Sequence, residues 1–363
     1  MDIRRILVIK LCCLGDIAQM TPALRALRQR YPQASIDFLC SSWVQELARR
    51  INGVRQVLLW DEPYQKISKL KLAFSFLTQV RRLARQHYDL AFIGHRSPAF
   101  AALAFGAHIP KRAGFGPGLG LLTHPVAFHS EIPEAQRYLD IAQCLGAQSH
   151  DKRLQINLLS EDQTALDELC RKENISLDHA PIAILPGGGD NPGTLMTIKR
   201  WDKERFAGLI KKLHANHGAP LILLGGPADI DLAQWITSQS HPIGVKNLAG
   251  KTGFSQLLAI LKHCRLAIGH DSGPLYLAAA LGTPTLMLFG PSDPLLVAPQ
   301  GPRRRYLVRR VPCHPCYTPQ TARNSSRFNG REFICWTGTH ECMKELSVAE
   351  VEQAVHEMLE NAN

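Results

Sequence analysis

Short apolar runs alternate with longer amphipathic segments along the first half of the chain. The runs at residues 5–9, 35–39, 54–59 and 89–93 are rich in aliphatic and β-branched side chains, as buried strands are. Residues 69–86 instead repeat apolar side chains at helical spacing. This alternation predicts a parallel sheet with helices on both faces.

The first helix is expected to begin at Thr21. A threonine side chain can cap a helix start, and Pro22 suits the first turn, where its missing N–H is not needed. Leu24 and Leu27 follow at helical spacing. Asp16 is accordingly expected just before this helix, in a loop.

The same rhythm restarts after a polar stretch at residues 169–180. Strands are predicted at residues 181–185, 220–224, 265–268 and 285–289. We therefore predict an α/β protein with two doubly wound domains, residues 1–175 and 176–346, followed by a terminal helix at 347–363. Open parallel sheets bind ligands beyond the carboxyl ends of their strands, so two such domains facing a central cleft would share one site.

The composition fits this organisation. A chain of 363 residues with 45% hydrophobic and 20% charged side chains is globular and long enough for two domains. No segment is long and continuously apolar enough to be expected to span a bilayer. The apolar run at residues 6–9 is too short for a signal-peptide core. The expected location is therefore the cytoplasm.

A formal net charge of +11 suits nucleic acid, an anionic membrane surface or a phosphorylated substrate. The basic residues are spread along the chain, with the largest groups of arginines at residues 303–305 and 309–310, and neither group belongs to a known nucleic-acid-binding pattern. We expect no nucleic acid partner. The charge favours a lipid-linked or anionic glycan acceptor and peripheral contact with the inner membrane surface. Simple solubility would explain the same charge.

Asp16 ends the segment KLCCLGD, which follows the first strand. A sugar hydroxyl that attacks an anomeric carbon must lose its proton. A positioned carboxylate that accepts this proton increases the reaction rate by about 10²–10⁴-fold. Asp16 is thus the candidate catalytic base. Acidic residues near helix starts are also common without any catalytic role, because the helix dipole favours them there.

A glycine loop in the second half is a candidate for holding a diphosphate. Gly187, Gly188 and Gly189 directly follow a predicted strand, so their backbone N–H groups can approach phosphate closely. Lys199 and Arg200 add positive charge a few residues later. The spacing is not that of a P-loop, and a flexible loop with a basic end is the alternative.

The segment GHDSGPLYLAAALG is a second candidate. Ser272 can cap a helix whose first turn contains Gly273 and Pro274, and a helix start binds anions. Asp271 could accept hydrogen bonds from sugar hydroxyls. A well-capped core helix would look the same, since residues 275–281 are almost wholly apolar.

Asp229 and Asp231 form an Asp-x-Asp pair, which could indicate a metal-dependent sugar transferase. The pair is expected in the first turn of a helix, where acidic residues are common without a metal. A lysine and a helix dipole can neutralise a leaving pyrophosphate instead. No catalytic metal is therefore predicted.

Three long segments carry a resemblance to a known family. They are ILVIKLCCLGD with TPALRALRQRYP, then LPGGGDNPGTLMTIKRW, then GHDSGPLYLAAALGTPTLMLFGPSDP. In this order they resemble the heptosyltransferases of lipopolysaccharide synthesis, glycosyltransferase family 9. The resemblance covers nearly the whole chain and implies a GT-B fold of two Rossmann-like domains. It also implies an inverting, metal-independent transfer from a nucleotide sugar, usually ADP-heptose, bound mainly by the C-terminal half.

The resemblance also implies roles for single residues. Asp16 matches the family's proposed base, and Lys199 matches a lysine that contacts donor phosphate or acceptor. The residues that match those holding the donor's sugar and phosphates are Asp271, Ser272 and Gly273.

The element KRAGF is similar to a family segment near the acceptor, which makes Lys111 and Arg112 candidate acceptor-binding residues. The chain departs from the family pattern at Cys12 and Cys13, where small hydroxyl residues are frequent, and at Tyr276, where histidine is common. These departures keep a non-catalytic nucleotide-binding protein open as an alternative. A nicotinamide-dependent oxidoreductase would instead need GxGxxG after the first strand, and KLCCLGD does not supply it.

Four of the ten cysteines gather near the C-terminus: Cys313, Cys316, Cys335 and Cys342. The first pair has the CxxC spacing of a zinc site, whereas the second pair is more widely spaced. A structural zinc ion and a set of reduced structural cysteines both fit this pattern. No metal is assigned to it.

Overall fold

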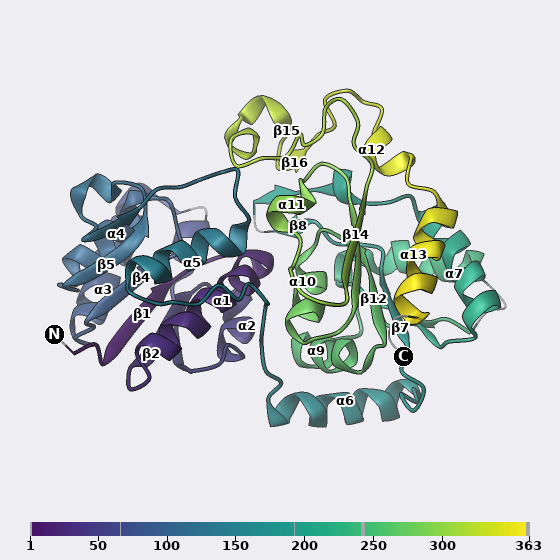
Figure 1. Cartoon of the computed structure of the whole chain (residues 1–363), viewed down its shortest axis with the longest axis horizontal. Helices are drawn as coiled ribbons and strands as arrows, with labels where there is room; N and C mark the ends of the chain where they lie inside the picture. Colours follow the sequence, from purple (N-terminus) through teal and green to yellow (C-terminus); the bar gives the residue numbers. More distant parts are fainter. Residues whose placement is uncertain (1, 66, 192, 241–243, 361–363) are drawn as a thin grey trace. The chain divides into compact units, whose positions relative to one another are not determined.

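A computed structural model describes residues 2–65, 67–191, 193–240 and 244–360 (Figure 1). The chain divides into two compact units, Met1–Asn157 and Leu158–Asn363. The sequence predicts this division near residue 175, after helix α6 (Ser160–Glu173). The structure places α6 in the second unit, because it packs on α9 (Phe254–His263).

The first unit contains a six-stranded sheet in the order β3-β2-β1-β4-β5-β6, and every neighbouring pair is parallel. Its strands are β1 (Arg5–Ile9), β2 (Ser35–Cys40), β3 (Val54–Leu59), β4 (Leu90–Ile93), β5 (Lys111–Phe115) and β6 (His124–Val126). The first four confirm the prediction. The strands β5 and β6 are not among the predicted ones, because neither KRAGF nor HPV is a continuous apolar run.

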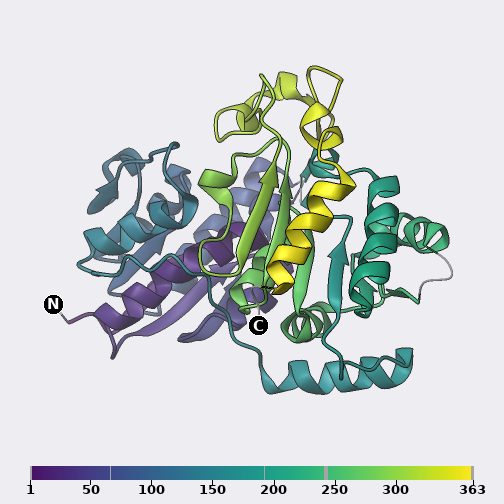
Figure 2. The same cartoon turned by 45° about the vertical axis from the view of Figure 1, so that its right-hand side comes forward.

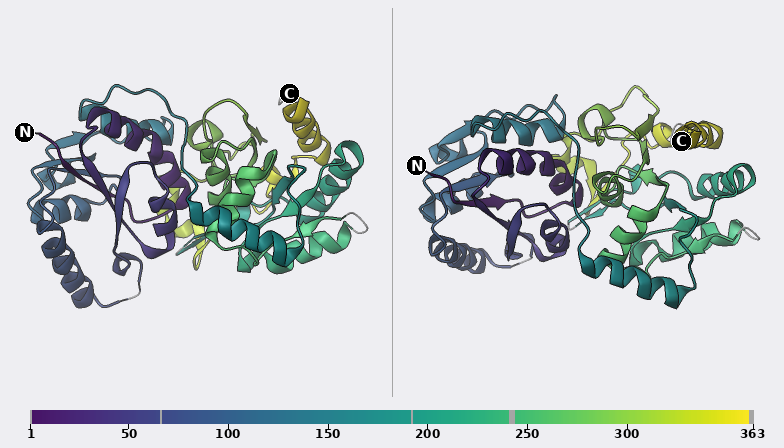
Figure 3. Two further views of the ribbon diagram at one scale, coloured as in Figure 1. Left: turned by 90° about the horizontal axis from the view of Figure 1, so that it is seen from below. Right: turned by 60° about the horizontal axis from the view of Figure 1, so that its bottom comes forward.

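Helices cover both faces of this sheet, as predicted (Figure 3). They are α1 (Leu14–Arg30), α2 (Gln45–Arg49), α3 (Lys69–Ala84), α4 (Pro98–Gly106) and α5 (Glu134–Cys144). Leu7 and Ile9 of β1 point to one face and share a buried cluster with Leu83 of α3 and Leu103 of α4. Helix α1 packs against α5.

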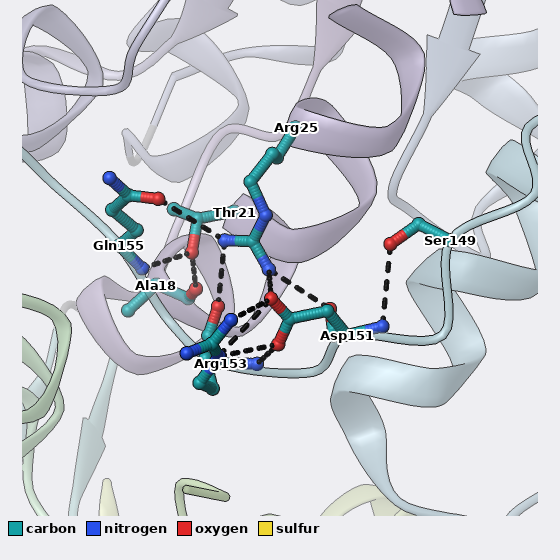
Figure 4. A network of polar contacts seen from close by, with 7 residues as sticks. All are labelled: Ala18, Thr21, Arg25, Ser149, Asp151, Arg153 and Gln155. Carbon is teal, nitrogen blue, oxygen red and sulfur yellow. Dashed lines mark hydrogen bonds and ion pairs between the residues drawn. The ribbon is translucent and has the colours of Figure 1, made fainter. Parts of the chain in front are cut away.

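Helix α1 begins at Leu14, so the predicted start at Thr21 is wrong. Pro22 lies inside the helix and has no N–H to donate to the Ala18 carbonyl. The Thr21 hydroxyl donates to that carbonyl instead (2.7 Å), and the backbone N–H of Gln155 donates to the same hydroxyl (3.1 Å) (Figure 4). The helix therefore continues through the proline, and Asp16 lies in its first turn rather than before it.

The segment that ends the first unit is tied to α1 by the same network. Arg25 forms an ion pair with Asp151 (3.0 Å) and donates to the Arg153 carbonyl (3.0 Å). Figure 4 shows these groups converging beside the helix. The contacts fix the chain along the face of α1 before it leaves the unit.

The second unit repeats the design with the strand order β11-β10-β7-β12-β13-β14, again all parallel. Its strands are β7 (Ile182–Leu185), β10 (Leu221–Leu223), β11 (Lys246–Asn247), β12 (Leu266–His270), β13 (Thr285–Phe289) and β14 (Arg304–Val308). The four predicted strands are confirmed. The edge strands β11 and β14 were not predicted, since basic and polar residues interrupt them.

The helices of this unit besides α6 and α9 are α7 (Lys203–His217), α8 (Ile230–Gln239), α10 (Gly273–Ala280), α11 (Pro294–Val297), α12 (Glu341–Lys344) and α13 (Val348–Glu360). The terminal helix α13 packs on α7 (Figure 2). Of the predicted 347–363 helix, residues 361–363 lie outside the described residues.

A small third sheet in the order β15-β16-β9-β8 was not foreseen. It consists of β8 (Asp190–Asn191), β9 (Thr194–Leu195), β15 (Phe328–Asn329) and β16 (Glu332–Phe333). Strand β16 pairs with β9 through Glu332 and Leu195. The segment that follows the three glycines is thus paired with the C-terminal cysteine region, while Pro192 lies outside the described residues.

Candidate active site

In the first unit, the candidate residues follow the central strand β1. The buried Lys10 ammonium lies 2.7 Å from the Asp16 carboxylate, whose side chain is 36% exposed. Burial is the largest single influence and opposes the charge of Lys10, but Asp16 and the neighbouring Tyr138 and cysteine side chains together raise the pKa of Lys10 well above its ordinary value. Lys10 therefore holds the Asp16 carboxylate in place and leaves it within reach of solvent.

Helix α5 places a second carboxyl group in this cluster. Glu134 accepts a hydrogen bond from the Tyr138 hydroxyl (3.2 Å), and the Lys10 ammonium lies 5.7 Å from the centre of the Tyr138 ring. Burial and then the negative charge of Asp16 raise the pKa of Glu134 to about 7. Sequence analysis missed Glu134 and Tyr138, because they are distant from Asp16 in the sequence. Lys10, inside KLCCLGD, was the only local signal.

The backbone between β1 and α1 is fixed from the neighbouring strand β4. The N–H of Leu11 donates to Nε2 of His95 (2.7 Å), whose ring stacks on Phe100 (4.3 Å between centroids). Burial and then the charge of Lys10 hold the pKa of His95 well below its ordinary value, so the ring is neutral and accepts this bond. Cys13 caps the helix with φ 73°, a strained conformation for a residue other than glycine.

The two cysteines that depart from the family pattern lie in this turn. A hydrogen bond with Cys12, followed by burial, raises the pKa of the Cys13 thiol. The thiol therefore stays protonated. A thiol is a weaker hydrogen-bond donor than the hydroxyl it replaces.

Lys111 and Arg112 begin β5 at the opposite edge of the sheet. Lys111 pairs with Leu90, which pairs with Ile6 near the start of β1, whereas Asp16 follows the end of β1. The Arg112 guanidinium donates to the Leu121 carbonyl (2.6 Å) and so holds the loop after β5. This position gives no support to the predicted role in acceptor binding.

In the second unit, the predicted donor-binding residues converge at the ends of β7 and β12. Gly188 and Gly189 have φ values of 99° and 80°, which favour glycine. A Cβ atom on Gly188 would lie 2.9 Å from Cβ of Ser272. The glycine loop therefore lies directly against the start of α10, as one continuous backbone surface.

Asp229 braces the glycine loop. Its carboxylate accepts the N–H of Gly226 (3.0 Å) and the N–H of Gly188 (3.4 Å), and it lies 3.6 Å from the Arg200 guanidinium. A Cβ atom on Gly187 would fall 2.0 Å from its Oδ1 atom. The Gly188 N–H is thus occupied by a protein carboxylate, contrary to the expectation that all three glycines offer N–H groups to phosphate. Asp231 lies in the first turn of α8, as predicted.

His270 links the glycine loop to the basic segment behind it. Its Nε2 atom accepts the N–H of Trp201 (2.7 Å), and its Nδ1 atom lies 3.3 Å from the Gly187 carbonyl. Burial lowers the pKa of His270 to about 4. The ring is therefore neutral, with Nδ1 as the donor. Sequence analysis had quoted His270 without assigning it a function.

Lys199 and Asp271 form a nearly buried ion pair (2.6 Å). Asp271 also accepts hydrogen bonds from Tyr276 (2.6 Å) and Ser292 (2.8 Å). Burial opposes its ionisation, but Lys199 and the two hydroxyls hold the pKa of Asp271 below its ordinary value. The carboxylate, expected to bind sugar hydroxyls, thus already accepts three hydrogen bonds from the protein, one of them from the Lys199 ammonium. Tyr276 departs from the family pattern and is part of this arrangement.

The start of α10 presents a small set of polar groups beside this pair. Ser272 is the N-cap, and its side chain makes no capping hydrogen bond. Pro274 has no N–H, and the N–H of Leu275 donates to the Ser272 carbonyl (3.0 Å). The Gly273 N–H and the Ser272 hydroxyl are therefore the groups that this helix start offers an anion.

The comparisons with known proteins decide the family. The family model described as glycosyltransferase family 9 (heptosyltransferase) matches residues 77–325, which include all the predicted donor-binding residues. The chain belongs to glycosyltransferase family 9. Asp16 lies outside the matched range, so its role depends on the geometry of the first unit.

Relatives of this family 9 glycosyltransferase cover most of its length. It is 28% identical over 319 residues to lipopolysaccharide heptosyltransferase 2 of Salmonella typhimurium, covering 84% of this chain and 87% of that one. A family 9 glycosyltransferase from Veillonella parvula matches with a TM-score of 0.81 at 21% identity, over 99% of both chains. The Escherichia coli heptosyltransferase WaaC with ADP-2-deoxy-2-fluoro heptose matches with a TM-score of 0.68 at 18% identity, over 97% of this chain and 99% of that one. The predicted GT-B fold is confirmed.

The C-terminal cysteines of this glycosyltransferase are all free thiols, like the other six. The N–H of Cys316 donates to the Pro291 carbonyl (3.0 Å), and Cys342 is buried. Burial raises the pKa of both thiols to about 11. Within the described ranges, no group of three or more His, Cys, Asp or Glu side chains is arranged to hold a metal ion.

Proposed function

We propose that this glycosyltransferase transfers heptose from ADP-heptose to a hydroxyl of a lipopolysaccharide-core or other glycan acceptor, with inversion at the anomeric carbon. The observation that carries the donor assignment is the Lys199–Asp271 pair beside the glycine loop and the start of α10. A fixed ammonium and a helix start together attract a diphosphate. The relatives named for heptose transfer, one of them solved with an ADP-heptose analogue, support ADP-heptose as the donor.

In this proposal the second unit stabilises the leaving group. Negative charge develops on the diphosphate as the anomeric bond breaks, and donors that are already positioned stabilise such charge best. Lys199 supplies the full positive charge, and the Gly273 N–H supplies a dipole. Asp271 acts as a positioning residue, because it contacts the lysine rather than the substrate.

In the first unit, we assign proton removal to Asp16. Its carboxylate is partly exposed and is held by Lys10 (2.7 Å). It can therefore accept the proton of the attacking hydroxyl without a prior rearrangement of its side chain. Glu134 shares the cluster, and the negative charge of Asp16 contributes to its raised pKa.

We place the enzyme in the cytoplasm, in peripheral contact with the membrane. The ten free thiols support a reducing compartment, and the net charge of +11 supports an anionic partner. Among the described residues, no helix combines the length and the apolar character that crossing a bilayer requires.

Donor binding tests the proposal directly. We expect ADP and ADP-heptose to raise the melting temperature of the wild-type protein, because a ligand that binds only the native state stabilises it. Lys199→Ala should weaken ADP binding by about 10-fold or more, in line with the loss of one charge-assisted contact. Lys211→Ala, on the exposed side of α7, is the matched control and should bind ADP like the wild type. Stabilisation by UDP- or GDP-sugars with none by ADP-heptose would refute the donor assignment.

A further inference from the structure

Helix α3 of the first unit is apolar on two opposite sides. Leu83 is buried in the core and Val80 packs against it. The other side carries Leu70, Phe74 and Leu77, which are 81%, 70% and 54% exposed. Steps of four and three residues place these three side chains in one stripe. Neighbouring large apolar side chains that are this exposed mark a surface where another molecule binds.

Positively charged side chains accompany this apolar stripe on the same helix. The helix and its C-cap contain five exposed cations and no acidic residue: Lys69, Lys71, Arg81, Arg82 and Arg85. Arg82 donates to the Leu59 carbonyl (3.2 Å). The other four make no ion pair with any described residue. We call the three apolar and five basic side chains together the α3 face.

Exposed apolar side chains continue beside the α3 face. Helix α4 packs on α3 and exposes Phe105, and the short 3₁₀ helix Gly118–Gly120, which packs on α4, exposes Leu119 at its tip. The loop with Leu119 follows the carboxyl end of β5, the same edge of the sheet that carries Asp16. The apolar surface thus extends from α3 towards the edge where we place the acceptor.

We infer that the α3 face docks the enzyme onto an anionic membrane surface. Interfacial helices combine an apolar stripe of Leu and Phe with flanking Lys and Arg, as this helix does. The apolar side chains would enter the boundary between headgroups and acyl chains, and the cations would lie among acidic headgroups. The docking gains its purpose from the proposed function, because a lipid-linked acceptor lies in that surface, but it requires neither donor nor acceptor.

Charge complementarity favours a membrane over a second copy of the chain. A symmetric dimer through this face would place the same patch on both subunits. The helix α3 and its C-cap of each copy would then bring five cations and no carboxylate, and like charges oppose such an interface. An anionic bilayer instead attracts all five.

Flotation of the full-length protein with lipid vesicles tests the inference. We expect binding to vesicles of phosphatidylglycerol and phosphatidylcholine in equal parts, and little binding to phosphatidylcholine alone. The triple variant Leu70→Gln/Phe74→Gln/Leu77→Gln should lose at least about 10-fold in partitioning. Lys69→Gln/Lys71→Gln should lose about five-fold per cation at low salt, and high salt should weaken wild-type binding.

Matched controls separate docking from folding and from catalysis. Lys211→Gln/Lys212→Gln removes two exposed cations from α7, and Leu295→Gln removes a half-exposed leucine from the second unit; both should float like the wild type. All variants should keep the wild-type melting temperature and its increase with ADP, so a failure of the donor assignment would appear there and not in flotation. Equal flotation of the triple variant and the wild type would overturn the inference. So would a wild-type dimer in solution that the triple variant abolishes, because a protein would then cover the face.

Discussion

The two units use the same sheet design to build unlike sites. In the second unit, Lys199 and Asp271 are nearly buried and hold each other, with Tyr276 and Ser292 completing the set. In the first unit, Asp16 remains partly exposed, beside Glu134, whose pKa lies near 7. We conclude that the charged groups of the second unit are held in position before a ligand binds. The proton removal that we propose for the first unit instead requires a carboxylate that solvent and substrate can reach.

Among the variants considered, replacing Asp16 should have the largest effect, because it should lower turnover and leave ADP binding intact. Asp16→Asn keeps the size of the side chain but cannot accept the proton, so turnover should fall by about 10²–10⁴-fold. ADP affinity should stay within about two-fold of the wild type, because the proposed ADP-binding groups belong to the other unit and make no described contact with Asp16. Transfer kinetics with ADP-heptose and calorimetric titration with ADP measure the two quantities.

Asp231→Asn is the control for this variant, because Asp231 is exposed on α8 and has no assigned role. It should leave turnover unchanged. Wild-type turnover in Asp16→Asn would remove Asp16 from the mechanism.

Removing the partner of Lys199 should have the next largest effect. Asp271→Asn leaves a mostly buried ammonium without its counter-charge, which costs on the order of 3 kcal/mol in the free energy of unfolding, and ADP binding should weaken because the lysine is no longer held. Tyr276→Phe removes only one hydrogen bond to Asp271 and should cost about 1 kcal/mol. Chemical denaturation measures both. Equal stabilities for Asp271→Asn and the wild type would contradict the view that this pair is fixed in advance.

The smallest effect concerns the titration of Glu134. Its pKa of about 7 in the folded protein lies above the value of roughly 4.3 in unfolded chains. Its contribution to stability is therefore fully present below about pH 4 and is lost as the pH rises through about 7. Glu134→Gln abolishes this loss, so the variant should gain stability relative to the wild type between pH 5 and pH 8.

The expected gain in the free energy of unfolding is on the order of 1 kcal/mol. It is small because solvent near Glu134 screens part of the electrostatic effect that shifts the pKa. Melting curves of both proteins across this pH range measure it. Asp140→Asn is the control for this variant, because it changes a carboxylate elsewhere on α5. It should not alter the pH dependence of stability. A constant difference between Glu134→Gln and the wild type at all pH values would rule out Glu134 as the titrating group.

The central strands could be predicted from the sequence because they are buried on both faces and appear as continuous apolar runs. The strands β5 and β14 could not be predicted, since basic residues begin both. The predicted start of α1 was wrong for a chemical reason. The Thr21 hydroxyl supplies the hydrogen bond that Pro22 cannot make, and no local sequence pattern indicates that it does so.

The candidate site was predictable where its residues follow strands. The three glycines, Lys199 and the start of α10 converge as their positions suggested. The partners of these residues could not be predicted, because they come from distant elements. Glu134 lies on α5, and Asp229, expected only to begin a helix, closes on the glycine loop.

His270 has a consequence for how the enzyme responds to acid. Its Nε2 lone pair is committed to Trp201 and its pKa is about 4, so the ring cannot take up a proton while the loop keeps its shape. Donor binding should therefore be insensitive to mild acidification. The acid limb of the activity profile would then report on the first unit alone.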